Sequence, residues 1–150
     1  MGKIEGISIR NYGSLKEITL GKNFTHQKEK PLSNMTTIIG PSGIGKSTIA
    51  DVFGFIADCL EMDVEAACDA GNRGGFEQIR SQGVDEAIRI ELYYRESSNT
   101  KPMTYEVSID LDKHSRPYVK EERLRQRVKE RGWPLSFLHL QNGKGFAFEG

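Results

Sequence analysis

"IIGPSGIGKST", residues Ile38–Thr48, is a short apolar run followed by a glycine-bracketed loop and then by lysine, serine and threonine. The segment Gly40–Ser47 fits the pattern GxxxxGK[ST], which is typical of a phosphate-binding loop (P-loop) when a strand precedes it and a helix follows it. Met35–Ile39 is short and rich in β-branched residues, which predicts a buried strand. Apolar residues recur every three or four positions after Lys46, which predicts a helix.

Each residue type in this loop has a physical reason. The glycines let the backbone turn successive N–H groups inward, and they keep side chains away from bound phosphates. Phosphates then lie at the helix N-terminus, where unpaired N–H groups and the helix dipole favour negative charge. We expect Lys46 to reach the β and γ phosphates of ATP, Ser47 to ligate Mg²⁺, and Thr48 to contact the α phosphate. The residues predicted to bind the nucleotide are Gly40, Pro41, Ser42, Gly43, Ile44, Gly45, Lys46, Ser47 and Thr48, with Lys46 as the catalytic phosphate contact.

The rest of the chain divides by its hydrophobic period. Alternating residues on both sides of Gly13 predict a β-hairpin, and the polar segment Gly21–Asn34 predicts a surface loop. The P-loop strand and helix occupy about 35–60. Alternation returns after a glycine-rich break and predicts an antiparallel β subdomain over about 86–150, in which 118–130 is either a strand or a short helix.

Composition limits the partners. Twenty-one Lys and Arg balance 21 Asp and Glu, so no whole-chain field attracts nucleic acid or membrane. No apolar run approaches the roughly 20 residues of a membrane span, which predicts a cytoplasmic location and no membrane partner. Cys59 and Cys68 are not spaced as metal ligands and are read as reduced structural thiols. The acid-rich segment Asp51–Asp69 has no basic residue and is read as a solvated helix face.

Hydrolysis needs more than the P-loop. An acidic residue at the end of a second core strand normally holds Mg²⁺, and a further group positions the attacking water. The nearest candidates are Glu91, Asp110 and Asp112, but their segments alternate with polar residues as half-exposed strands do. We therefore read all three as surface carboxylates.

The order of these features resembles a known family. The opening "IEGISIRNYGSLKEITL" (4–20), the P-loop, and the later segments "RGGFEQIRSQG" (73–83), "EERLRQRV" (121–128) and "FLHLQNGKG" (137–145) are similar to the N-terminal lobe of ABC-type ATPase heads. The resemblance is to heads of the SMC, RecF and RecN kind, and more closely to predicted AAA-family ATPases related to the OLD family, many of them in prokaryotic phage-defence systems. It implies an α/β P-loop NTPase fold, an ABC-ATPase-like N-terminal lobe with an antiparallel β-meander subdomain.

The resemblance also implies a second lobe and a dimer. In such proteins the second lobe carries the signature motif, the Mg²⁺-binding acid and a catalytic glutamate, and ATP lies between two heads. None of those motifs occurs in residues 1–150. We therefore expect a second ATPase lobe or a homodimer as partner, and association through the apolar face that the second lobe would cover.

Several residues keep two interpretations. Some relatives have a nucleotide-contacting arginine where this chain has Gly13, so Arg10 or Lys16 would have to substitute for it. Tyr12 is either an adenine contact or a core residue. Gln141 is either the glutamine loop, which senses the γ phosphate, or a residue beside the Asn142–Gly143 turn.

The stretch 113–131 is rich in Lys and Arg and is either a nucleic-acid contact or a solvated face. The sequence as a whole predicts ATP and Mg²⁺ binding by part of an ATPase whose hydrolysis requires the second lobe, so that this chain alone turns over little ATP. One alternative is a non-catalytic module in which ATP orders a surface for a partner. Another is a small P-loop phosphotransferase, which would need an acceptor-binding helical segment and an arginine lid.

Overall fold

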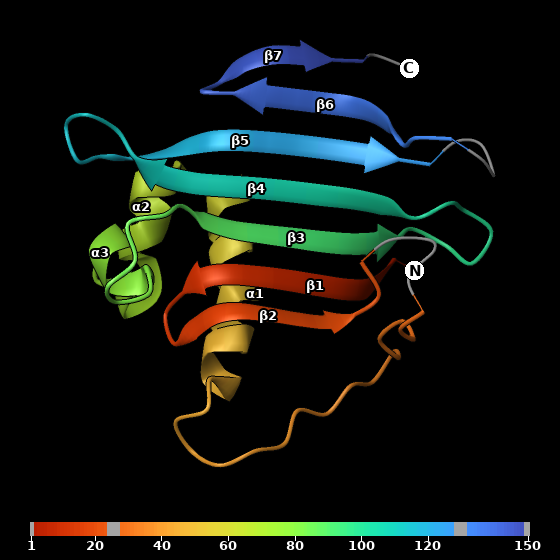
Figure 1. Cartoon of the computed structure of the whole chain (residues 1–150), viewed down its shortest axis with the longest axis horizontal. Coiled ribbons are helices and arrows are strands. Elements are labelled where there is room, and N and C mark those ends of the chain that lie inside the picture. Colours follow the sequence, from red (N-terminus) through yellow and green to blue (C-terminus); the bar gives the residue numbers. More distant parts are fainter. Residues whose placement is uncertain (1, 24–27, 128–131, 149–150) are drawn as a thin grey trace.

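The computed structural model describes residues 2–23, 28–127 and 132–148, and the elements named below belong to these residues (Figure 1). Two strands open the chain, one long helix and then a group of short helices follow, and five strands close it. The strands are β1 (Lys3–Tyr12), β2 (Leu15–Gly21), β3 (Ile88–Arg95), β4 (Met103–Leu111), β5 (Pro117–Gln126), β6 (Leu135–Gln141) and β7 (Lys144–Ala147). The helices are α1 (Lys46–Glu61), α2 (Val64–Asp69), the 3-10 turn η1 (Ala70–Asn72) and α3 (Phe76–Ile79).

All seven strands form one antiparallel sheet in the order β2-β1-β3-β4-β5-β6-β7. The predicted opening hairpin and closing meander are both present. They form a single sheet, because β1 pairs with β3, with Ile9 opposite Ile90. The segment with two interpretations, 118–130, is a strand as far as Gln126. Its residues 128–130 lie outside the described part.

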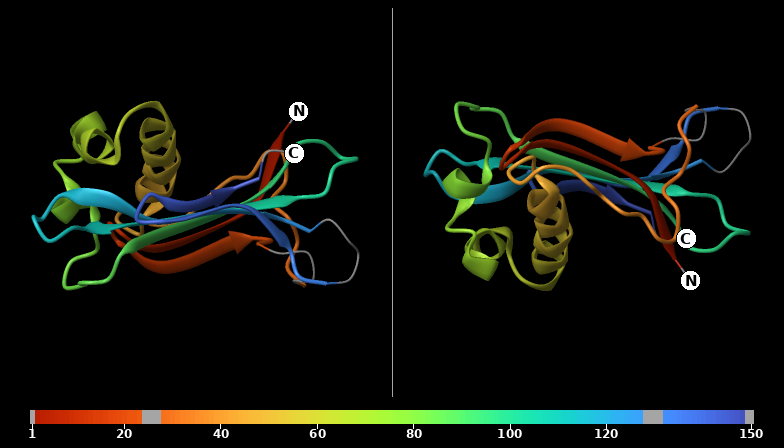
Figure 2. Two further views of the ribbon diagram at one scale, coloured as in Figure 1. Left: turned by 90° about the horizontal axis from the view of Figure 1, so that it is seen from above. Right: turned by 90° about the horizontal axis from the view of Figure 1, so that it is seen from below.

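The helices cover one face of the sheet, as Figure 2 shows. Period-2 alternation points Ile7, Ile9, Ile88 and Ile90 toward α1, which contributes Val52, Phe55 and other apolar side chains to a continuous core. The opposite face is polar. Its central carboxylate, Glu106, is buried under Arg89 and Arg125, which lie 2.6 and 3.0 Å from its oxygens.

The strand predicted at Met35–Ile39 is not formed. These residues have no strand assignment, and Met35 and Ile39 are 86% and 89% exposed. A strand requires a neighbour that takes up its N–H and C=O groups, and none of the sheet's described strands pairs with 35–39. Strand propensity without a partner is therefore insufficient, and the segment runs beside the sheet as irregular chain.

The predicted helix after the P-loop is present in the structure. The period after Lys46 predicted an amphipathic helix, and α1 begins at that residue and buries Ile49, Val52, Phe55 and Ile56. The helices within the described residues are each too short or too polar to cross a lipid bilayer.

Candidate nucleotide-binding site

The P-loop leads directly into α1. Gly45 has φ 101°, and its carbonyl accepts the first helical bond, from the N–H of Ile49 at 3.0 Å. A cavity of about 410 Å³ opens in front of this helix N-terminus. It is lined by Ser14, Ser42, Gly43, Gly45, Lys46, Ser47 and Thr48.

Six of the nine predicted nucleotide-binding residues thus surround one cavity. Of the other three, Gly40 and Pro41 contribute their carbonyls, and Ile44 is 61% exposed. The ammonium of Lys46 donates to the Gly40 carbonyl and, at 2.7 Å, to the Pro41 carbonyl. The structure therefore holds the one cation of the motif over the loop, beside the exposed hydroxyl of Ser47.

Ser14 is the residue that sequence reasoning missed. It lies at the tip of the β1–β2 hairpin, and its Oγ is 3.4 Å from Oγ1 of Thr48. The hairpin also packs closely against the P-loop at Gly45, because a Cβ on Gly45 would lie 2.8 Å from Cδ2 of Leu15. The only signal in the sequence was the turn at Gly13, which predicts a hairpin but not the element on which it packs.

The hairpin tip is fixed in place by the segment that follows α3. The N–H of Gly13 donates to the Ile79 carbonyl at 2.5 Å, and Oγ of Ser81 donates to the Gly13 carbonyl at 2.8 Å. The N–H of Ser81 donates in turn to the Asn11 carbonyl at 3.1 Å. Three backbone groups, on Asn11 and Gly13, are thereby held, so Ser14 is presented to the cavity by a rigid element.

Tyr12 belongs to the core. It is 2% exposed, its ring packs 5.4 Å from that of Phe55, and its hydroxyl donates to Oδ2 of Asp51 at 2.6 Å. Burial, followed by the hydrogen bond to Asp51, raises the pKa of Tyr12 above its usual value. The interpretation of Tyr12 as an adenine contact is therefore wrong, because a base cannot reach a ring enclosed on all sides.

Arg73 extends this link beneath the site. Its side chain is 7% exposed, and its guanidinium donates to Asp51 at 3.0 Å and to Asp58 at 2.5 Å, both on α1. It also lies 5.6 Å from the centre of the Phe55 ring. Two acids of the segment read as a solvated helix face are thus paired with a buried arginine, which the sequence places 22 and 15 residues away.

The candidate substitutes for the missing arginine lie in different places. Arg10 is on the polar face, where it pairs with Glu17 at 2.7 Å. Lys16 instead lines a second cavity of about 520 Å³, which is also lined by Gly13 and Ser14 of the hairpin tip. Of the two cations, Lys16 is therefore the one beside the P-loop cavity.

The three acids considered for Mg²⁺ are engaged elsewhere. Asp110 accepts from Lys120 at 2.9 Å; burial opposes ionisation, but this bond and the Leu111 N–H hold the pKa of Asp110 below its usual value. Asp112 caps the β4–β5 turn by accepting the N–H groups of His114 and Arg116. Burial and the nearby Glu106 raise the pKa of Glu91. Within the described ranges, no group of three or more His, Cys, Asp or Glu is arranged to hold a metal ion.

Gln141 lies beside a tight turn. Asn142 and Gly143 have φ of 52° and 74°, as a two-residue hairpin turn requires, and Gln141 pairs with Lys144 across it. In the sheet order, β6 lies four strands from β1, which is about 19 Å at the usual strand spacing. The geometry thus favours the turn interpretation over the glutamine loop.

Part of the basic stretch 113–131 is engaged on the polar face of the sheet. Lys120 pairs with Asp110, Arg123 contacts His139 and Glu121, and Arg125 pairs with Glu106. Lys113 and Arg116 lie in the β4–β5 turn and are exposed.

The fold and the cavity together define a class: an α/β domain with a phosphate-binding loop at a helix N-terminus. A family model described as "AAA domain, putative AbiEii toxin, Type IV TA system" matches residues 35–148. The chain belongs to this family of AAA domains, which makes it a nucleotide-binding domain of the P-loop ATPase type. No curated protein and no solved structure matches the chain significantly.

Proposed function

We propose that this chain binds ATP with Mg²⁺ as the N-terminal lobe of an ABC-type ATPase head of the SMC, RecF and OLD kind. The observation that carries the proposal is the P-loop cavity, where Lys46, Ser47 and Thr48 line one wall and the hairpin residue Ser14 lines another. The loop N–H groups and Lys46 would hold the phosphates, and the Ser47 hydroxyl would ligate the metal.

We propose further that hydrolysis requires a second lobe and a second head. The residues that line the P-loop cavity in the described structure include no carboxylate, although the reaction needs one to hold Mg²⁺. Met35, Ile39 and Ile44 expose apolar side chains next to the loop, at 86%, 89% and 61%. Such neighbouring apolar surface supports a covering lobe that also gives 35–39 a strand to pair with.

The test is ATP titration by calorimetry, with and without Mg²⁺, on the chain and on Lys46→Ala. We expect the variant to bind ATP at least about tenfold more weakly, because a charge-assisted contact to phosphate contributes roughly 1.5–3 kcal/mol. Lys113→Ala is the matched control, since it removes an exposed lysine from the β4–β5 turn. Equal affinity of Lys46→Ala and the unaltered chain would rule out the site.

A phosphate-release assay separates binding from turnover. We expect release by the chain alone to stay near the uncatalysed background, and Ser47→Ala to remove the effect of Mg²⁺ on ATP affinity. Rapid release by the chain alone would contradict the need for a second lobe.

The lack of a carboxylate around the cavity also favours a second candidate, a non-catalytic module in which ATP orders a surface for a partner. Supplying the C-terminal remainder of a head distinguishes the two. The ATPase proposal predicts that turnover appears, whereas the module proposal predicts that ATP stays intact.

The family description names a putative toxin of a type IV toxin–antitoxin system. We propose on this basis, and on the resemblance to OLD-related ATPases, that the chain serves a phage-defence system. Phage plating on cells that carry the encoding system with or without Lys46→Ala tests this, and equal plating on both would count against it.

A further inference from the structure

The end of the sheet opposite the P-loop carries one basic residue from each of five neighbouring strands or their flanks. Lys22 follows β2, Lys3 begins β1, Arg95 ends β3, Lys101 precedes β4, and Arg127 follows β5. The strand register brings them together, because Lys3 lies opposite Arg95, and Met103 lies opposite Gln126. Four strand spacings make this row about 19 Å long.

Hydrogen bonds confirm that these strand ends are neighbours. The N–H groups of Lys22 and Leu32 both donate to the Glu5 carbonyl, at 2.9 and 2.8 Å. Arg95 donates to the Thr100 carbonyl at 2.7 Å, next to Lys101. Lys28 and Lys30, both exposed, precede Leu32. We call this surface the basic end; it consists of Lys3, Lys22, Lys28, Lys30, Arg95, Lys101 and Arg127.

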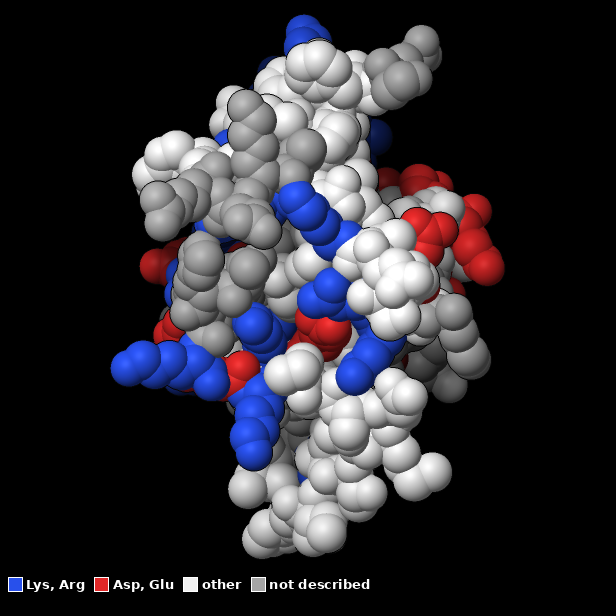
Figure 3. Space-filling view, turned by 90° about the vertical axis from the view of Figure 1, so that its right-hand side faces the viewer, with Lys and Arg blue, Asp and Glu red and all other residues white. Residues whose placement is uncertain are grey.

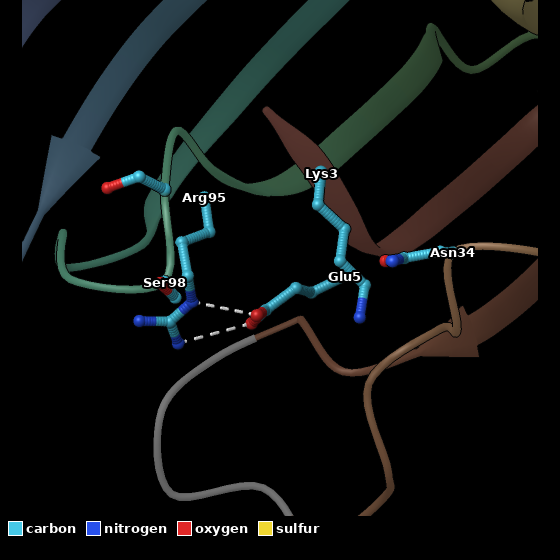
Figure 4. Close-up of a pocket in the computed structure, with 6 residues that line it drawn as sticks. Lys3, Glu5, Asn34, Arg95 and Ser98 are labelled. Atoms are coloured by element: carbon cyan, nitrogen blue, oxygen red, sulfur yellow. Dashed lines mark hydrogen bonds and ion pairs between the residues drawn. The ribbon is translucent and has the colours of Figure 1, made fainter. Parts of the chain in front are cut away.

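Among the described residues of the basic end, Lys and Arg outnumber Asp and Glu. The basic end contains seven basic residues, against three acids in the same segments, Glu5, Glu29 and Glu96. Of these, the Glu5 side chain is 9% exposed and accepts from Arg95 at 2.8 and 3.4 Å (Figure 4). Figure 3 shows Lys and Arg side chains gathered on this face. A chain with zero formal net charge thus has a local positive field here.

The same surface is hollowed and polar. A cavity of about 690 Å³ is lined by Lys3, Glu5, Asn34, Arg95, Ser97 and Ser98. Hydroxyl and amide groups next to cations are the groups that contact phosphate and sugar in nucleic-acid complexes. The cavity and the row of cations therefore fit a phosphate-bearing chain.

An aromatic side chain completes the pattern. Trp133, the single tryptophan of the chain, is 95% exposed. It comes two residues before Leu135, which pairs with Gln126 at the end of β5, so it lies at the same end of the sheet. Proteins that bind single-stranded nucleic acids combine a positive track for the backbone with aromatic rings on which unpaired bases stack.

We propose that the basic end binds single-stranded nucleic acid, with the row of Lys and Arg on the phosphates and Trp133 stacked on a base. A duplex keeps its bases stacked on one another, so it offers Trp133 no free ring face except at its ends. This surface differs from the stretch 113–131, of which it uses Arg127 alone. It lies at the other end of β1 from the P-loop and does not depend on ATP.

The test begins with oligothymidine of about 20 nucleotides, added at low salt while Trp133 fluorescence is recorded. We expect saturable quenching, because the only tryptophan contacts the bases directly. The logarithm of affinity should fall linearly with the logarithm of salt concentration. The same titration with oligouridine compares DNA with RNA. Saturable binding of either, seen by anisotropy of a labelled oligonucleotide, without a change in Trp133 fluorescence would overturn the stacking arrangement.

Variants separate the two parts of the surface. Lys3→Gln, Lys22→Gln and Lys101→Gln together should lower the salt slope by about 2, at roughly 0.7 per lost phosphate contact with a single strand. The triple control Lys113→Gln, Arg116→Gln and Lys144→Gln removes the same charge from the β4–β5 turn and the start of β7, at the other end of the sheet, and should change little. Equal losses in both triple variants would overturn the proposal.

Trp133→Ala should weaken single-strand binding about tenfold, measured by the anisotropy of the labelled oligonucleotide, without lowering stability, since the ring is almost fully exposed. Duplex DNA of the same length should bind more weakly than the single strand. Vesicles of phosphatidylcholine and phosphatidylserine should not compete with the oligonucleotide. Tighter binding of the duplex or competition by the vesicles would assign the basic end to another partner and overturn the proposal.

Discussion

The two ends of strand β1 use charge in opposite ways. At the hairpin end, the buried Arg73 is enclosed between Asp51 and Asp58, and the hydroxyl of Tyr12 adds a further bond. At the basic end, Arg95 pairs with one carboxylate, that of Glu5, and its side chain stays 30% exposed. One end therefore uses its charges to fix a turn against the P-loop, and the other presents them to solvent.

The difference shows where geometry matters most. Phosphate recognition by a P-loop depends on N–H groups held in fixed positions, so the turn that carries Ser14 is secured by Ser81 and Ile79. A sequence-independent phosphate track depends mainly on charge and tolerates mobile side chains. The comparison is open to test by matched substitutions at the two ends.

The largest expected effect comes from the two arginines. Arg73→Ala should lower the free energy of unfolding by about 3–5 kcal/mol, because it removes a buried guanidinium that donates hydrogen bonds to Asp51, Asp58 and the Ala67 carbonyl. Arg95→Ala should cost about 1–3 kcal/mol, since it removes one pair that is partly exposed. Urea unfolding followed by circular dichroism measures both. If Arg95→Ala costs as much as Arg73→Ala, the contrast between the two ends is wrong.

The next effect concerns the contact between hairpin and P-loop. Gly43 and Gly45 both have positive φ, so alanine at either position strains the backbone by about 1–2 kcal/mol. Only at Gly45 does the added Cβ also collide with Leu15, at 2.8 Å, while Gly43 has no atom within 4 Å. Gly45→Ala should therefore cost about 1–3 kcal/mol more than Gly43→Ala. Equal unfolding energies would mean that the hairpin does not pack on the loop.

The smallest expected effect on stability comes from Glu91, which lies in β3 between the hairpin end and the basic end of the sheet. Burial, followed by the charge of Glu106, raises the pKa of Glu91 in the folded chain. A raised folded pKa means that the ionised form costs stability at neutral pH, and that this cost diminishes as pH falls through the folded pKa and is gone below the unfolded pKa. Glu91→Gln should thus raise the melting temperature slightly at pH 7 and not at pH 4.

Thermal scans across this pH range measure the Glu91 effect. The same change at exposed Glu17, which pairs with Arg10, should give no gain at neutral pH. A loss of stability in Glu91→Gln at pH 7 would mean that its contact with Arg125, at 3.9 Å, outweighs its burial.

Local pattern predicted most of the elements correctly. The 3.6-residue period after Lys46 became α1, and period-2 alternation became the hairpin and the closing meander. These predictions succeeded because each element faces one apolar core, and that requirement is written into neighbouring residues. The strand at Met35–Ile39 failed because its pairing partner is not specified by its own residues.

The candidate site likewise contains residues that the sequence predicted and one that it did not. The motif names Lys46, Ser47 and Thr48, because phosphate binding requires a loop, a lysine and a hydroxyl at consecutive positions. Ser14 could not be found this way, since it is 34 residues from Thr48 and has no spacing rule that connects it to the loop.

Spacing along the chain was thus enough to specify the P-loop motif, the helix that follows it, the opening hairpin and the closing meander, because local hydrogen bonding and hydrophobic period act over a few residues. The folded sheet was required for three further features: the packing of the hairpin on the loop, the burial of Tyr12, and the gathering of seven Lys and Arg residues at one end. Those features join residues far apart in sequence, and only the strand register and the packing of the helices on the sheet bring their side chains within reach of one another.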